Sequence, residues 1–508
     1  MASRRDELNA YTFAKRRTLA SFIQPSPTGS DEGAPRPLRA VLPGAVMAVV
    51  LLAGSGAWGM FRPAAPPGWD TPGEKVIVAS LSTTRYVVLT TDGRSELHPV
   101  LNMASAKLLL APDKGQVVKV DESVLDRGSL PRGATLGIPY APDRLPSPEE
   151  AGSAKRWAVC ERPGDGGRAI QKAAFVLAGR DRGRTDGAER LTGGELMYVV
   201  GAEDKTRYVV DARGTKYPVG TDELLLRALV GAGRTPERVS KEWLETLRSG
   251  DPVAFPDVGG EIGGPAGVPG TLAPEANRIG VVLRAVNGAG TQYYLVRRGR
   301  VSPVSDFTAK LLLTSRRLGA VMKTGQATAT NASLFRPEAT EFPDHANWPR
   351  RMPVAVNDAG TTGGSRNTLC NVLRDVDEDS GAVTLSTWAG TDFPRPLPTG
   401  SSSAYVTPGS GQLFRQIQGS GTRAGGVFLV TDTGLRYAMQ SNGDSAEGDA
   451  GTGLTARQRE RLDQEARQAQ TRLGYAKSEP APIPVSWSRF LPLGPRLSTG
   501  AARRPQGS

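Results

Sequence analysis

Hydrophobic and polar positions follow one repeated plan along most of this chain. Four segments each contain an apolar strand, a tight turn with glycine, a second strand that ends at or near proline, and then a helical pattern of apolar residues. Glycine supplies the positive φ of a tight hairpin turn, and β-branched and aromatic residues fit a half-buried pleated surface. The pattern therefore predicts four hairpin–helix repeats. Their hairpins span residues 84–100, 206–219, 291–304 and 426–438.

The four repeats also form two pairs at long range. Equivalent positions of the two halves lie about 200 residues apart, and several independent positions share this spacing. We therefore predict two similar halves, each built as repeat–core–repeat, around a central β core with pseudo-two-fold symmetry. The matched positions are 106–110 (AKLLL) with 309–313, Pro99 with Pro303, Gly214 with Gly434, and Cys160 with Cys370.

An uncharged and mostly apolar run precedes the repeats. As a helix rising ~1.5 Å per residue, residues 40–61 would cross a hydrocarbon core of ~30 Å. A cleaved signal peptide is the alternative, because residues 55–57 (SGA) form an acceptable cleavage triplet. However, residues 1–39 precede the run, whereas a whole signal peptide normally has about 15–30 residues. We therefore predict an uncleaved transmembrane helix.

The segment before this run is basic and amphipathic. Its Lys and Arg residues favour a cytoplasmic N-terminus, so residues 62–508 are predicted to be exported. The spacing predicts a helix that lies on anionic lipid or docks in the groove of a partner, and a solvated basic flank is an equal alternative. The face in question carries Leu8, Tyr11, Lys15, Leu19 and Phe22.

Composition and charge limit the kinds of functional site and partner that the chain can have. Two His and two Cys exclude most zinc sites, histidine-driven triads and disulfide-dense scaffolds. The net charge of +12 suits anionic lipid or envelope polymers, but a general solubility charge explains it equally well. Basic residues stand among acidic ones without the aromatic stripe of a nucleic-acid platform, so we predict no nucleic-acid partner. His98 and His345 lie in different motifs and are both expected to be structural.

Phosphate-binding and catalytic motifs are incomplete. Residues 179–185 (GRDRGRT) approach a P-loop but are one residue short and carry Arg184 in place of lysine, so we expect a solvated loop. Residues 323–325 (KTG) lack the leading glycines, and no serine has glycine at both minus two and plus two. We predict no catalytic residue, no cofactor-binding residue and no metal ligand.

The two cysteines carry the one specific site prediction. Cys160 and Cys370 occupy equivalent places in the two halves, each in an apolar strand-like segment. Exported compartments are oxidising, so two cysteines there favour a disulfide, with two buried thiols as the alternative. We predict the bridge Cys160–Cys370.

Several stretches of the chain are specific enough to indicate a family. They are 4–5 (RR), 11–17 (YTFAKRR), 97–106 (LHPVLNMASA), 157–160 (WAVC) and 428–437 (FLVTDTGLRY). In these stretches the chain resembles the EccB family, the membrane component of actinobacterial type VII (ESX) secretion systems. The resemblance runs from residue 4 to about residue 495, and it departs at a Gly/Asp/Ser-rich insert, 441–455, and at the tail.

The resemblance implies a membrane-anchored α+β fold with one N-terminal transmembrane helix and an elongated, β-rich extracytoplasmic domain. It implies a structural membrane component that organises the extracytoplasmic side of the secretion channel, with EccC, EccD, EccE, the mycosin protease, lipid and further copies of the chain as partners. Family members are often labelled ATP hydrolases, so ATP would be a cofactor only if that label holds. A membrane-tethered ATP hydrolase or a cell-envelope polymer binder is the alternative.

The expected division of the chain follows these patterns. Residues 1–39 form the cytosolic helix, 40–61 the transmembrane helix, 62–73 a Pro/Gly linker, 74–115 repeat 1, 116–193 core segment a, 194–250 repeat 2, 251–276 a linker, 277–330 repeat 3, 331–405 core segment b, 406–478 repeat 4, and 479–508 a Pro-rich tail.

Overall fold

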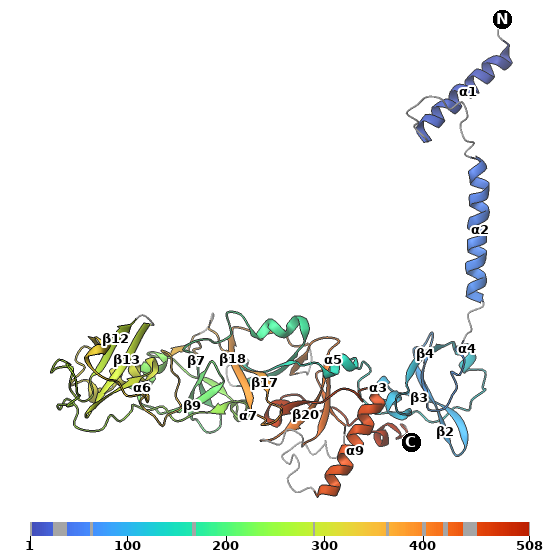
Figure 1. Cartoon of the computed structure of the whole chain (residues 1–508). Coiled ribbons are helices and arrows are strands. Elements are labelled where there is room, and N and C mark those ends of the chain that lie inside the picture. The colour runs from blue at the N-terminus through green and yellow to red at the C-terminus, as the bar shows by residue number, and fades with distance from the viewer. Residues whose placement is uncertain are drawn as a thin grey trace.

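The computed structural model shows an elongated folded body from which two helices extend towards the N-terminus (Figure 1). These helices are α1 (Arg4–Ile23) and α2 (Leu38–Met60). Among the residues described, no helix is both long enough and apolar enough to cross a membrane. The structure describes residues 3–23, 38–60, 65–164, 169–287, 290–361, 365–398, 403–419, 425–439 and 455–506.

Four sheets of the body share one strand order. In each sheet the first strand pairs antiparallel with the second, the second with the third, and a fourth strand lies parallel to the first on its other side. Sheet 1 contains β1 (Lys75–Ala79), β2 (Arg85–Thr91), β3 (Arg94–Val100) and β4 (Gln116–Val120). Sheet 2 contains β7 (Glu195–Gly201), β8 (Arg207–Asp211), β9 (Thr215–Val219) and β10 (Glu237–Val239), with β11 (Arg248–Ser249) and β16 (Val354–Ala355) added.

The other two sheets repeat this order. Sheet 3 contains β12 (Val282–Asn287), β13 (Gly290–Arg297), β14 (Arg300–Val304) and β15 (Thr328–Thr330). Sheet 4 contains β20 (Gly411–Ile417), β21 (Val427–Thr431), β22 (Arg436–Ala438) and β23 (Ala481–Pro484). The hairpins expected from the sequence are therefore present as β2–β3, β8–β9, β13–β14 and β21–β22. Their turns use the positive φ of Gly93 and Gly299, among others, as hairpin geometry requires.

A helix follows the third strand of each sheet. Each of these helices begins at a polar side chain that accepts a hydrogen bond from a backbone N–H of the first turn, which satisfies a donor that has no partner within the helix. These N-cap residues are Asn102, Asp222, Ser305 and Thr455. The helices are α3 (Met103–Leu109), α6 (Glu223–Val230), α8 (Asp306–Thr314) and α9 (Ala456–Leu473).

A central sheet lies among the other four, in the strand order β18-β17-β5-β6-β19. The hairpins β5–β6 and β17–β18 meet through an antiparallel pairing of β5 with β17. The strands are β5 (Arg156–Pro163), β6 (Ile170–Leu177), β17 (Thr368–Val376), β18 (Val383–Gly390) and β19 (Ala404–Val406).

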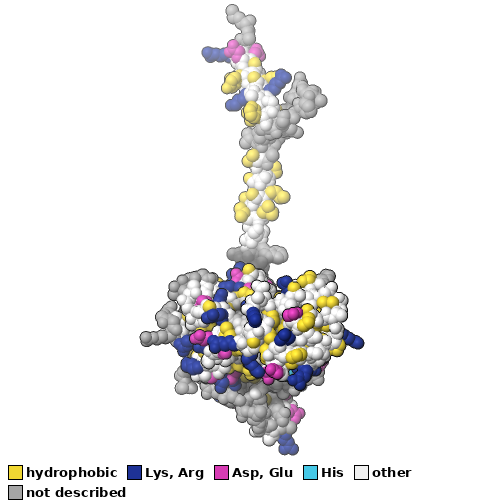
Figure 2. All heavy atoms as spheres, turned by 90° about the vertical axis from the view of Figure 1, so that its left-hand side faces the viewer, with side chains coloured by type: hydrophobic (Ala, Val, Ile, Leu, Met, Phe, Trp, Pro, Cys, Tyr) yellow, Lys and Arg dark blue, Asp and Glu magenta, His cyan; other side chains and the backbone are white. Residues whose placement is uncertain are grey.

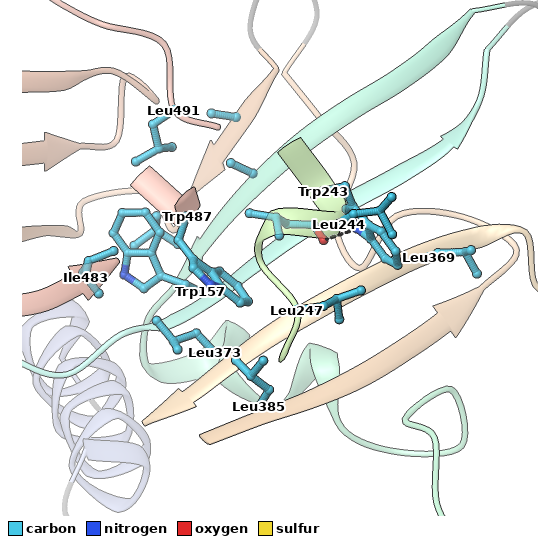
Figure 3. Close-up of a cluster of buried hydrophobic side chains, with 14 of the residues drawn as sticks. Trp157, Trp243, Leu244, Leu247, Leu369, Leu373, Leu385, Ile483, Trp487 and Leu491 are labelled. Carbon is cyan, nitrogen blue, oxygen red and sulfur yellow. Dashed lines mark hydrogen bonds between the residues drawn. The ribbon is translucent and has the colours of Figure 1, made fainter. Parts of the chain in front are cut away.

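Apolar clusters join the sheets to one another. The largest includes three tryptophans, Trp157 of β5, Trp243 of α7 (Lys241–Glu245) and Trp487 of α10 (Val485–Ser488), which are almost completely buried (Figure 3). It connects the central sheet with sheets 2 and 4. A second cluster packs α3 of sheet 1 against α9 and against α11 (Thr499–Ala502). The first and last parts of the sequence that forms the folded body thus lie side by side (Figure 1).

Two segments expected to be separate from the sheets pack onto them. The tail contributes β23, α10 and α11, and Trp487 and Leu497 are buried there. The expected linker 251–276 places Val258 and Val268 in the apolar cluster of sheet 3. Of the insert 441–455, only Thr455 lies within the described residues. The remaining short helices are α4 (Glu122–Leu125) and α5 (Pro148–Gly152), with 3₁₀ turns at Gly179–Thr185, Arg316–Leu318 and Ala332–Leu334.

Candidate functional site: the disulfide-linked central sheet

Cys160 and Cys370 face each other across the middle of the central sheet. They are register partners on β5 and β17, their Cα atoms are 4.0 Å apart, and their sulfurs form a disulfide. Both residues are completely buried, with Phe175 and Trp388 in the same cluster. Close cross-strand Cα atoms are typical of a non-hydrogen-bonded antiparallel pair, whose side chains approach closely. The bridge therefore joins the two halves of the chain at the centre of the fold.

A buried carboxylate next to the bridge fastens the central sheet to sheet 2. Glu161 accepts hydrogen bonds from the backbone N–H of Ser240, at 2.7 Å, and from its hydroxyl. Ser240 is the N-cap of α7, so the carboxylate lies where helix N–H groups have no partner within the helix. Burial raises the pKa of Glu161, and the hydrogen bonds from Ser240 oppose that rise. A salt bridge of 2.9 Å between Lys172 and Glu242 supports the same junction.

Two indole N–H groups make further links from β5. Trp157 donates to Gln412 of sheet 4 at 2.7 Å, and Trp243 of α7 donates to the backbone carbonyl of Val159 at 3.2 Å. Buried Trp N–H groups need such partners, because an unpaired polar group in an apolar interior is unfavourable. The central sheet is thus bonded to sheet 4 on one side and to α7 on the other.

The segment that resembles a P-loop is a 3₁₀ turn, Gly179–Thr185, held by its own carboxylate. Asp181 is completely buried and accepts hydrogen bonds from Arg395 Nε at 2.9 Å, Tyr405 at 2.8 Å and Thr407 at 3.0 Å. Burial alone would raise the pKa of Asp181, but these hydrogen bonds outweigh burial and hold it below its usual range. The sequence predicts a solvated loop here, and this prediction is wrong for Asp181, whose side chain is buried.

This arrangement does not suit a phosphate. Asp181 points its negative charge inward, where it pairs with Arg395, and Arg184 is exposed at the surface. A phosphate cradle instead needs free backbone N–H groups and a cation directed at the ligand. The residues 323–325 form an exposed turn.

The two histidines lie apart in the structure. His98 is buried on β3, and its Nδ1 lies 2.9 Å from the carbonyl of Ala134. His345 is exposed, and its Nδ1 lies 3.2 Å from Asp344. Within the described ranges, His, Cys, Asp and Glu side chains form no group of three or more that could hold a metal ion.

A cleft of about 950 Å³ lies between sheets 2 and 3. Its lining carries both signs of charge, and two of its acids are already paired, Glu195 with Arg366 and Glu341 with Arg350. A balanced lining does not select a ligand by charge. The charged lining residues are Arg213, Arg248, Arg350, Arg351, Glu195, Asp211, Asp306 and Glu341.

The face of the body that Figure 2 turns to the viewer likewise shows no patch of a single charge sign among its described residues. Its Lys and Arg side chains are scattered among acidic and hydrophobic ones (Figure 2). The buried polar contacts described above join sheet to sheet and do not converge on a ligand cavity. The described residues thus form an elongated, internally cross-linked body with an N-terminal helical extension.

Comparison with known proteins identifies the family. The sequence model described as "Type VII secretion system ESX-1, transport TM domain B" matches residues 1–507. This chain therefore belongs to the EccB family of type VII secretion membrane components, and it is a structural component of that secretion system.

Similar curated proteins carry the same family name. The "ESX-3 secretion system ATPase EccB3" of Mycolicibacterium smegmatis is 26% identical over 492 residues, covering 91% of this chain and 83% of the relative. The "ESX-2 secretion system ATPase EccB2" of Mycobacterium tuberculosis is 26% identical over 463 residues and covers 87% of each chain.

Solved structures share the fold. A chain of an intact ESX-5 inner membrane complex matches with a TM-score of 0.53 and 22% identity, covering 100% of this chain and 96% of that chain. The EccB3 dimer from an ESX-3 core complex matches with a TM-score of 0.56 and 22% identity, covering 84% and 99%. At this level of identity the likeness concerns the fold alone.

Proposed function

We propose that this chain organises the extracytoplasmic side of a type VII secretion channel as a rigid, membrane-anchored scaffold. The observation that carries the proposal is the central sheet, in which one disulfide joins β5 to β17. Buried hydrogen bonds, which Glu161 accepts from Ser240 and Trp157 donates to Gln412, then fasten this sheet to sheets 2 and 4. A body tied together in this way holds its binding partners at fixed positions relative to the membrane.

The proposed topology places residues 1–39 in the cytoplasm, residues 40–61 across the membrane and residues 62–508 outside. The seven Lys and Arg residues before the apolar run favour this orientation. The described side chains of α2 are uncharged and exposed, including Val46 and Leu51, which suits contact with lipid (Figure 2). A disulfide also suits an oxidising exported compartment.

The proposed architecture is two related halves, each with two repeats and one core segment. The shared strand order of the four sheets and the back-to-back hairpins of the central sheet support this division. In this scheme the fourth repeat runs on through the former tail, because β23 completes sheet 4. Repeat 1 likewise runs on to Val120, because β4 completes sheet 1, and the other boundaries proposed from the sequence are kept.

The proposed partners are EccC, EccD, EccE, the mycosin protease and further copies of this chain. The support is that similar chains occur in structures described as an ESX-5 inner membrane complex and as an EccB3 dimer. On the cytoplasmic side, α1 exposes Tyr11 and Phe22, which offer apolar contacts to lipid or to a partner.

Deleting this chain should abolish assembly of the secretion complex, because a scaffold holds partners that do not meet without it. The measurement is a native gel of detergent-extracted membranes from cells with and without the gene, probed for the FtsK-like ATPase of the same system. Full-length chain should restore the high-mass band, and a chain that begins at residue 62 should not.

An enzyme function would give a different pattern. If the band persists in the deletion strain and purified full-length chain hydrolyses ATP, the alternative of a membrane-tethered ATP hydrolase gains support. In that case Arg184→Ala or Lys323→Ala should abolish the activity while Arg336→Ala, a matched surface change, leaves it intact. Under the scaffold proposal, all of these proteins hydrolyse no more ATP than a matched blank.

Thiol labelling should separate the two sides of the membrane. A membrane-impermeant maleimide applied to intact cells should label Gln464→Cys on the exposed face of α9 and should not label Ala10→Cys on α1. The native cysteines can stay in place, since they are bridged and completely buried. Labelling of Ala10→Cys in intact cells would reverse the proposed orientation. Ser478, a second candidate position for a cysteine in the exported part, is unsuitable for labelling because it is buried.

A further inference from the structure

The chain enters the folded body at one small apolar cluster of sheet 1. Ala65 and Trp69 pack against this cluster, which also contains Leu125 of α4. Lys75 Nζ donates to the carbonyl of Pro67 at 2.9 Å, so the segment after Ala65 is fastened to the body. The stiff linker expected at residues 62–73 is thus folded onto sheet 1 from Ala65 onward.

Covalent geometry then keeps this corner of the body near the end of α2. Helix α2 ends at Met60, and the chain up to Ala65 can span at most about 18 Å at ~3.6 Å per residue. Figure 1 shows α4 at the edge of the body that lies nearest to α2. Whatever α4 holds therefore lies within reach of the membrane surface if α2 is the anchor.

One carboxylate of α4 builds a rigid turn at this corner. Glu122 accepts hydrogen bonds from the N–H of Leu81 at 2.8 Å, from the N–H of Ser82 at 2.7 Å and from the hydroxyl of Ser80 at 3.0 Å. The backbone hydrogen bond from Ser82 is the main cause of a Glu122 pKa lowered to about 2, so the carboxylate stays ionised. Thr83, with a φ of 57°, closes the turn in the left-handed region.

The turn presents a leucine to solvent. Leu81 is 82% exposed, whereas its neighbours Ser80, Ser82 and Thr83 are polar and uncharged. The turn thus has a fixed backbone and an exposed aliphatic tip, its sequence neighbours are uncharged, and the Glu122 charge is engaged by the N–H and hydroxyl groups of the turn. Such a tip suits the interfacial region of a bilayer, where apolar side chains lose contact with water. Trp69, half-buried in the same corner, is of the residue type enriched at membrane interfaces.

We propose that the turn at Ser80–Thr83 inserts Leu81 into the outer interface of the membrane that α2 crosses, and thereby fixes the tilt of the ectodomain. This inference rests on the proposed anchoring through α2. The occupant is the lipid surface, because the short tether from Met60 keeps this corner of the body close to the bilayer that α2 would cross. A second contact with the bilayer, beside the anchor, restricts tilting of the elongated body relative to the membrane.

Fluorescence quenching in lipid nanodiscs tests the contact with the full chain. A bimane label is attached to Leu81→Cys, to Val50→Cys in α2, or to Gln464→Cys on α9, which lies on the side away from α2 (Figure 1). Lipids that carry a nitroxide near the glycerol should quench the label at position 81 several-fold more than the label at 464. Iodide in the water should show the reverse order.

Each failure has its own signature. If the label at 81 responds to iodide as the label at 464 does, the turn lies in water and the inference is overturned. If neither quencher reaches position 81, protein covers it and the lipid contact is likewise overturned. If deep nitroxide lipids fail to quench the label at position 50, the anchor itself is wrong, and the proposed topology falls with the inference.

Discussion

Replacing Cys160 and Cys370 together by alanine should lower the free energy of unfolding by about 4–5 kcal/mol, the largest effect expected here. The bridge joins residues separated by 210 positions, and in the chain-entropy model a cross-link over so long a loop restricts the unfolded chain strongly. Urea unfolding followed by tryptophan fluorescence measures the change. The midpoint should fall and the slope should rise, because an unfolded chain without the bridge exposes more surface.

A matched substitution separates the cross-link from the packing. Val372→Ala removes buried methyl groups from the same cluster and leaves the bridge intact. It should cost about 1–3 kcal/mol through the cavity that it leaves, without a change of slope. A double-alanine variant that behaves like Val372→Ala, with unchanged slope, would show that the disulfide adds nothing beyond its packing.

The hairpins could be predicted because local chemistry determines them. Gly93 and Gly299 adopt the positive φ that their turns require, and the flanking strands carry the aromatic and β-branched residues of half-buried surfaces. The cysteine pairing could also be inferred, since equivalent positions in two similar halves meet where β5 and β17 pair.

The first and fourth strands of the sheets, which flank the hairpins in the sequence, could not be predicted in this way. Strand β1 lies before the predicted hairpin β2–β3, and β4 pairs with β1 only after the crossover through α3. Strand β23 contains two prolines, which argue against a strand in the middle of a sheet. It is nevertheless a strand, because it lies at the edge of sheet 4. In these cases pairing with a strand outside the local hairpin, and not the local sequence, determines the strand.

The buried polar links escape prediction for a related reason. The segment GRDRGRT is rich in charge and glycine and has the composition of a solvated loop. The partners of its Asp181 are Arg395, Tyr405 and Thr407, more than 200 positions later in the chain. The sequence offers a clearer sign of burial at Glu161 than at Asp181. Glu161 directly follows the apolar run 157–160, and a carboxylate in such a place indicates a buried charge with a partner.

Asp181→Asn should lower the free energy of unfolding by about 2–4 kcal/mol at neutral pH. The substitution removes a buried charge and leaves the Arg395 guanidinium without its counter-ion, and breaking a buried pair is strongly destabilising. The expected loss is smaller than for a fully buried pair because the Arg395 side chain is 28% exposed, so that water solvates part of its charge. The midpoint of urea unfolding at pH 7 measures the loss.

Acid should reduce the difference between the Asp181→Asn variant and the wild type. Because the pKa of Asp181 is below its usual value in the folded state, its contribution is complete above the unfolded pKa of about 4 and disappears as the pH falls through the folded pKa. Asp392→Asn is the control, since Asp392 pairs with Arg162 at 3.2 Å but is 85% exposed. It should cost at most about 1 kcal/mol at pH 7. If the Asp181→Asn difference is the same at pH 7 and pH 3, the carboxylate acts through packing alone and its charge is not what holds the turn.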